Sequence, residues 1–201
     1  MEQSEIIAEL RKIKGQVDGL LAVLDGAVEA PSRKLLFGAK VSPAFKASVL
    51  WIEEKLGLNA DNLMCCMAFE TGQTFSPKIK NLAGSSGTGL IQFMEATAKN
   101  MGTTTAELAK LTDVQQLAYV YRYFKAFGDN LDDWSLEDTY MAILYPKAIG
   151  KSPDWVMPWK YGSLAYKQNS GLDLNKDRQI TKAEASAGVR RMEKIGKELM
   201  G

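Results

Sequence analysis

The pattern of apolar and polar residues predicts a chain built almost entirely from helices. Apolar residues recur at steps of three and four along several segments, and no convincing alternation with the period of a strand is present. Ser42 followed by Pro43 is typical of a helix start, and Gly72 provides a stop directly after Glu70-Thr71. Helices are expected over residues 43–56, 61–70, 95–101, 113–127 and 135–145. The sequence therefore predicts a mainly α fold.

Residues 1–30 carry a short heptad pattern. Its apolar positions are Ile6, Leu10, Ile13, Val17, Leu20 and Leu24. Because the pattern spans fewer than three heptads, it favours an amphipathic helix docked on its own domain, and self-association or attachment to a larger assembly is the alternative. Residues 31–42 contain Pro31 and Gly38 without a sustained period, and we expect them to link this helix to the main domain.

Composition limits the class of protein. The chain has 201 residues, of which 46% are hydrophobic, which suffices for one domain of ordinary size with a small appendage. Its 25 basic and 24 acidic residues leave a net charge of +1, so nothing global points to nucleic acid. No apolar run approaches the roughly 18 residues of a membrane span, and the acidic start does not resemble a signal peptide.

The adjacent cysteines Cys65 and Cys66 are expected to be reduced packing residues. Neighbouring helical residues point about a third of a turn apart, which disfavours a disulfide between them. The chain contains no histidine, which argues against Ser-His-Asp and Cys-His nucleophiles and most catalytic zinc sites. Carboxylate chemistry, lysine chemistry, an oxygen-ligated metal or no catalysis remain.

Glu70 is the strongest candidate for carboxylate chemistry. It ends an apolar segment, and apolar neighbours such as Met67 and Phe69 would raise its pKa by disfavouring the ionised form. An acid that protonates a glycosidic oxygen near neutral pH needs such a raised pKa. Taken alone, Glu70 is better interpreted as an exposed residue at a helix end.

A second motif follows Glu70-Thr71 and changes this assessment. Residues 85–94 read Ser-Ser-Gly-Thr-Gly-Leu-Ile-Gln-Phe-Met. Together the two motifs resemble the soluble lytic transglycosylase family, which has the fold of goose-type lysozyme. Glu70-Thr71 matches the family's Glu-Ser, and Gly89-Leu90-Ile91-Gln92 matches its Gly-Leu-Met-Gln.

The third family motif, Ala-Tyr-Asn, is matched only in part. Tyr145 is retained, Pro146 replaces the asparagine, and residues 147–150 look like the variant of phage-encoded members. The resemblance covers roughly residues 43–168 and implies a lysozyme-like helical domain there, with residues 169–201 as a C-terminal unit.

The resemblance implies a lytic transglycosylase in which Glu70 is the sole acid and base. Glu70 would cleave the β-1,4 bond from MurNAc to GlcNAc in peptidoglycan glycan strands and leave a 1,6-anhydro product. Most glycosidases use two carboxylates, but the nearest other one, Glu95, is expected to be an exposed residue. Sugar-stacking aromatic residues are expected among Phe93, Tyr119, Tyr145, Trp155 and Trp159. The implied substrate-binding residues are Thr71, Ser86, Gly89, Leu90, Gln92, Phe93 and Tyr145.

The setting implied is that of a bacteriophage endolysin or virion-associated lysin. Without a signal peptide, the protein would be made in the host cytoplasm and reach the cell wall through a membrane lesion or with the particle. A muramidase that uses water on the same fold is one alternative. A non-catalytic, glycan-binding virion protein and a calcium-dependent interaction module are two others.

The C-terminal unit contains a pattern typical of an EF-hand calcium loop. The oxygen ligands would be Asp173, Asn175, Asp177, Gln179, Thr181 and Glu184, at positions 1, 3, 5, 7, 9 and 12. Arg178 stands where the loop normally has glycine, and a left-handed backbone there costs on the order of 1 kcal/mol. We expect any bound Ca²⁺ to be structural rather than required for the chemistry. The alternative is a metal-free loop held by helix-capping bonds.

Overall fold

The computed structural model describes residues 33–80 and 86–201, so the helix expected over residues 1–30 lies outside the described residues. As predicted, this part of the chain is mainly helical, and within it only isolated β-bridges occur. None of its helices combines the length and apolar character needed to cross a membrane. The helices are η1 (Gly38–Lys40), α2 (Pro43–Leu56), α3 (Ala60–Glu70), α4 (Glu95–Asn100), α5 (Thr105–Leu108), α6 (Asp113–Lys125), α7 (Leu136–Leu144), η2 (Pro146–Ala148), α8 (Leu164–Asn169), η3 (Ser170–Leu172) and α9 (Lys182–Glu198).

Local capping explains most helix starts. Ser42 accepts a hydrogen bond from the Phe45 amide at 3.1 Å, as the Ser-Pro signal before α2 predicts. Helices α5, α6, α7 and α9 each begin with a reciprocal capping box. The short α5 was not expected, although Thr104 and Glu107 have the capping-box spacing.

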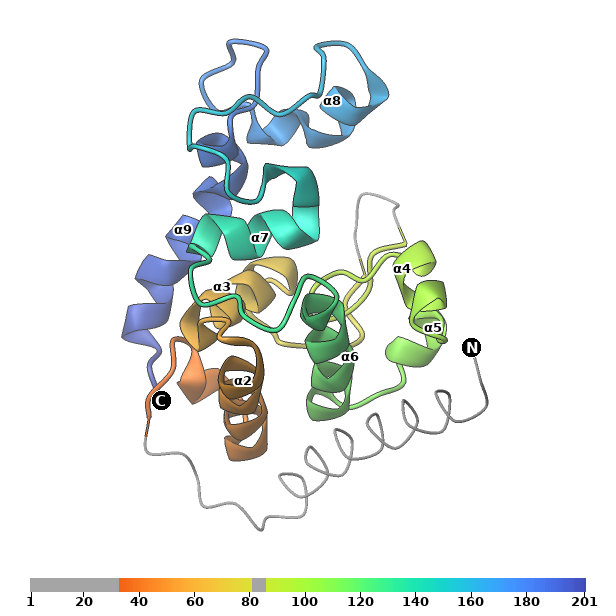
Figure 1. Cartoon of the computed structure of the whole chain (residues 1–201), viewed down its shortest axis with the longest axis vertical. Helices are drawn as coiled ribbons and strands as arrows, with labels where there is room; N and C mark the ends of the chain where they lie inside the picture. Colours follow the sequence, from red (N-terminus) through yellow and green to blue (C-terminus); the bar gives the residue numbers. More distant parts are fainter. Residues whose placement is uncertain (1–32, 81–85) are drawn as a thin grey trace.

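Helix α3 is the centre of the fold. It packs against α2, α7 and α9, and Figure 1 shows it between these helices. The six consecutive residues 63–68 are all buried, so α3 is covered on every side rather than along one stripe. The expected role of Cys65 and Cys66 is confirmed, since both are free and buried.

The two ends of the described chain share this core. Within the range expected to form a linker, Leu35 and Phe37 are fully buried. The Leu35 amide donates to the Gly201 carbonyl at 3.1 Å, and Figure 1 shows the C-terminus beside the segment that leads to α2. Val189 and Met192 on α9 are also buried, so the C-terminal helix packs as part of the main hydrophobic core.

A buried ion pair ties the start of α9 to the start of α7. Lys182 donates to an Asp138 carboxylate oxygen at 2.6 Å and to the Lys151 carbonyl at 2.8 Å. The two side chains are 4% and 14% exposed. Burial raises the pKa of Asp138, but hydrogen bonds from Lys182, Ser135 and Gly150 more than offset this and hold that pKa below its ordinary value. The ion pair therefore fixes the position of the first turn of α9 relative to α7.

We predict that Lys182→Met lowers the free energy of unfolding by about 3–5 kcal/mol, because Asp138 would stay buried without its cation. The matched control is Lys194→Met, at an exposed position of the same helix, which should change it by no more than about 0.5 kcal/mol. Urea denaturation of the three proteins measures the difference. Equal stability of the two variants would contradict a structural role for the pair.

Candidate active site

Glu70 is the last residue of α3 and is partly buried. Within residues 33–80 and 86–201, no hydrogen bond or ion pair reaches its carboxylate. Burial raises the pKa of Glu70 from 4.5 to about 7, the direction that the sequence predicts. Near neutral pH the carboxyl group is therefore present in both its protonated and ionised forms, as a residue that donates and then accepts a proton must be.

Tyr140 lies beside Glu70 and was not singled out from the sequence. It comes from α7, is 4% exposed, and packs edge-on against Phe69 with ring centroids 5.4 Å apart. Burial first, and then the nearby Glu70 and Cys66, raise the pKa of Tyr140 well above its ordinary value. Its phenol therefore stays protonated and neutral near neutral pH. In the sequence, Tyr140 is indistinguishable from an ordinary core residue of a helix.

Residues 88–93 form a tight hairpin. The Thr88 amide donates to the Phe93 carbonyl at 3.1 Å, and the Phe93 amide donates back to Thr88 at 2.9 Å. Gly89 has a φ of +80°, and its amide donates to the Ile79 carbonyl at 2.8 Å. The glycine-rich motif is thus a turn with a defined conformation, fastened to the preceding segment.

Gln116 holds this hairpin against α6. The side chain is fully buried, accepts a hydrogen bond from the Leu90 amide at 2.7 Å, and donates to the Pro77 and Leu108 carbonyls at 3.1 and 2.9 Å. A Cβ on Gly89 would lie 2.2 Å from the Gln116 Oε1 atom. Glycine is therefore required both for the close approach and for the positive φ. Gln116 was missed from the sequence, where a polar residue among the buried positions of α6 is the only signal.

Gln92 is strained and incompletely paired. Its φ is +52°, which is uncommon for a residue other than glycine. The side-chain amide donates to the Gly89 carbonyl at 3.1 Å, whereas Oε1 is buried and has no hydrogen-bond partner within the described residues. Backbone strain and unsatisfied buried acceptors often occur at binding sites. Gln92 is therefore the part of this motif best suited to receive a hydroxyl or amide of a ligand.

Several other residues of the expected substrate set have structural contacts. Thr71 is buried, donates to the Met67 carbonyl at 2.6 Å and accepts from the Phe75 amide at 3.0 Å, so it closes the end of α3. Leu90 is fully buried in the core. Ser86 is exposed and accepts from the Glu95 amide at 3.0 Å.

The expected aromatic residues fall into separate groups. Phe93 is only 2% exposed and packs against Tyr123, so its ring does not face a groove. Tyr145, at the end of α7, stacks on Trp155 with centroids 6.4 Å apart and meets Trp159 edge-on at 5.8 Å. These three half-buried residues form what we call the aromatic cluster. Tyr119 lies elsewhere on α6, under the Arg122 guanidinium.

Glu95 has a different environment from Glu70. Its carboxylate accepts hydrogen bonds from the Thr105 hydroxyl at 2.6 Å and from the Thr105 amide at 3.0 Å. These bonds lower the pKa of Glu95, so it stays ionised near neutral pH. Its contacts favour a structural role over that of a second acid.

Of the predicted calcium ligands, Asp173, Asn175, Asp177 and Gln179 lie in the loop that precedes α9, Thr181 is the N-cap of α9, and Glu184 is in its first turn. Asp173 is buried, Thr181 and Glu184 are half-buried, and Asn175, Asp177 and Gln179 are exposed. Arg178 has a φ of +72°, the left-handed conformation expected at its position. In the described part of the chain, no three Asp, Glu or Cys side chains converge closely enough to hold a metal ion on their own.

No family model, curated protein or solved structure matches the chain. The function of the site is therefore inferred from the geometry around Glu70, residues 88–93 and residues 173–184.

We predict that Glu70→Gln stabilises the protein at pH 8 but not at pH 4. Below pH 4.5 both folded and unfolded chains hold the proton; as pH rises towards 7 only the unfolded chain releases it, so folding loses free energy. The glutamine variant escapes this cost of about 3 kcal/mol. Urea denaturation at both pH values measures it, with the exposed Glu54→Gln as control. If the difference in stability between the variant and the parent is the same at both pH values, burial does not raise the pKa of Glu70.

We predict that Gln116→Leu lowers the free energy of unfolding by about 3 kcal/mol, because the buried Leu90 amide would lose its partner and the Pro77 and Leu108 carbonyls would each lose a donor. Gln168→Leu, at an exposed position of α8, is the matched control and should have little effect. Thermal denaturation compares the two. If both variants have the melting temperature of the parent, Gln116 does not hold the hairpin in place.

Proposed function

We propose that this protein is a peptidoglycan lytic transglycosylase of lysozyme-like fold in which Glu70 is the only acid and base. The observation that carries the proposal is the pKa of about 7 that burial gives Glu70, a carboxyl group without a hydrogen-bond partner among the described residues. The resemblance of Glu70-Thr71 and Gly89–Gln92 to the transglycosylase motifs directs this acid towards a glycosidic bond.

The proposed reaction needs one carboxyl group in two protonation states. Protonated Glu70 donates its proton to the oxygen that links MurNAc to GlcNAc, and the bond from MurNAc C1 to that oxygen breaks with assistance from the N-acetyl group. The Glu70 carboxylate then removes the proton from the C6 hydroxyl of MurNAc, whose oxygen attacks C1. The products are a free GlcNAc hydroxyl and a 1,6-anhydro ring, and Glu70 is protonated again.

Two features support glycan binding by this protein. The unpaired Oε1 of Gln92 can accept a hydrogen bond from a sugar hydroxyl or amide. The aromatic cluster of Tyr145, Trp155 and Trp159 offers partly exposed ring faces on which the apolar face of a sugar can stack. The contacts of Glu95 with Thr105 favour the single-carboxylate reaction over a muramidase that uses two.

We propose that the biological setting is phage lysis, with the protein acting as an endolysin or as part of the virion on the bacterial cell wall. The support is the sequence after Tyr145, where Pro146 and residues 147–150 resemble phage-encoded members of the family.

We predict that the protein releases muropeptides with anhydro-muramyl ends from purified peptidoglycan, and that Glu70→Gln reduces the rate at least about 100-fold. The exposed Glu54→Gln is the matched control and should retain the parent rate. Mass spectrometry of the released fragments distinguishes the outcomes. Reducing muramyl ends would replace the proposal with a muramidase, and no release by the parent protein would favour a non-catalytic glycan-binding protein.

We also predict that kcat/KM falls about ten-fold per pH unit above pH 7, because the first step requires protonated Glu70, whose pKa is about 7. Rates of peptidoglycan solubilisation between pH 5 and 9 test this. A rate that stays constant to pH 9 would show that Glu70 is not the proton donor.

A further inference from the structure

The loop before α9 pairs with the segment that carries two residues of the aromatic cluster. The Met157 amide donates to the Ile180 carbonyl at 2.8 Å, and the Lys182 amide donates to the Trp155 carbonyl at 2.9 Å. Val156 and Thr181 form an antiparallel bridge between these bonds. The end of the EF-hand-like loop is thus joined by backbone hydrogen bonds to residues 155–157.

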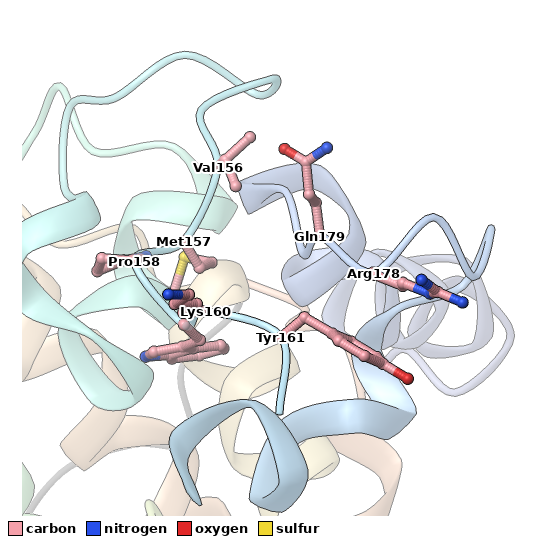
Figure 2. A pocket seen from close by; sticks show the side chains of 8 residues that line it. Val156, Met157, Pro158, Lys160, Tyr161, Arg178 and Gln179 are labelled. Carbon is pink, nitrogen blue, oxygen red and sulfur yellow. The ribbon is translucent and has the colours of Figure 1, made fainter. Parts of the chain in front are cut away.

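The loop already has the curved backbone that a cation site needs. Asn175 Oδ1 accepts from the Asp177 amide at 2.8 Å, and Asp177 Oδ1 accepts from the Gln179 amide at 2.8 Å. Arg178 has a φ of +72°, the left-handed conformation that the sixth position of such a loop requires. Its guanidinium lies over the Tyr161 ring at 4.9 Å, where Figure 2 shows the two side chains together.

Asp173 gives an independent indication of a ligand. It is 7% exposed, and its Oδ2 atom accepts hydrogen bonds from the Tyr166 hydroxyl and the Arg178 amide. Its Oδ1 atom is buried and has no hydrogen-bond partner within the described ranges. A buried carboxylate oxygen without a partner is costly, and a cation at this place would remove the cost.

Glu184 would complete the site by moving away from its capping position. Its Oε2 atom accepts from the Thr181 amide at 2.9 Å and hydroxyl at 2.8 Å, and its Oε1 atom accepts from the Asn175 amide at 3.3 Å. The carboxylates do not converge as the loop stands, because Glu184 caps α9. A cation would draw Glu184 from Thr181 towards Asp173. Thr181 is also the bridge partner of Val156. The movement of Glu184 would therefore change the contacts between residues 155–157 and the calcium loop.

We propose that residues 173–184 bind Ca²⁺ and that the bound ion fixes residues 155–157, and with them Trp155 and Trp159 of the aromatic cluster. The ligands are oxygens of Asp173, Asn175, Asp177, Gln179, Thr181 and Glu184, the hard donors that Ca²⁺ prefers.

The backbone contacts between residues 155–157 and the calcium loop also affect a cavity between the two segments. Residues 156–161 line a space of about 350 Å³ together with Arg178 and Gln179, and Figure 2 shows the labelled side chains from both segments around it. Ion binding therefore sets the shape of this cavity as well as the position of Trp159. An effect of Ca²⁺ on glycan cleavage rests on the proposed function, whereas ion binding and its effect on residues 155–157 do not.

The test is calorimetric titration of Ca²⁺ into the full-length, chelator-treated protein, followed by amide hydrogen exchange with and without about 1 mM Ca²⁺. We expect one bound ion and about ten-fold slower exchange at the Met157 and Lys182 amides. Absence of binding at this concentration, or binding that leaves both amides unchanged, would overturn the proposal.

Glu184→Gln separates ion binding from folding, because glutamine also serves at this position of a capping box. It should keep the parent melting temperature without Ca²⁺ and weaken binding about ten-fold or more. Asp177→Asn, at an exposed position of the loop, is a second variant for which weaker binding is expected, and Glu54→Gln is the control that should bind as the parent does. Unchanged affinity in both loop variants would place the ion elsewhere and overturn the proposal.

Glu70→Gln distinguishes this proposal from the proposed function. It should bind Ca²⁺ with the affinity of the parent and show the same slower exchange at Met157 and Lys182. Loss of Ca²⁺ binding in this variant would contradict a site built only from residues 173–184.

Discussion

The burial of helix α3 on every side is the constraint on which the rest of the structure depends. Its residues 63–68 have no exposed stripe, so α2, α7 and α9 must surround it. Glu70 ends this helix and shares its apolar surroundings, which raises the pKa of its carboxyl group to about 7. The packing that stabilises the fold therefore also creates an acid suited to neutral pH.

Most buried polar groups in the described chain have partners, which makes the exceptions informative. Gln116 holds the hairpin of residues 88–93 in place, and Lys182 holds the start of α9 in place, each with several hydrogen bonds. The buried side-chain atoms without a partner belong to Gln92, Asp173 and Ser186. Two of these stand in the motifs expected to bind a ligand, and Ser186 lies inside α9, where no contact suggests a function. Two of the three unpaired oxygens thus lie in the loops that carry the sequence motifs.

Local signals in the sequence predicted the local structure. The periodicity and caps gave α2, α3, α6 and α7, and the apolar context of Glu70 predicted the direction of its pKa shift. Contacts between distant segments could not be predicted in this way. Gln116 lies 26 residues from the Leu90 amide that it accepts from, and the burial of Phe93 depends on packing against another helix. Nothing in the sequence around Tyr140 shows that α7 would bring it beside Glu70.

The most direct test of the account is the carboxyl pKa of Glu70 itself, measured by ¹³C NMR from pH 3 to 9 on protein labelled at glutamate, with Glu70→Gln used to assign the signal. We predict a midpoint of about 7 for Glu70. A midpoint near the ordinary 4.5 would mean that water or another group solvates the carboxylate, and would remove the physical basis for Glu70 as a proton donor.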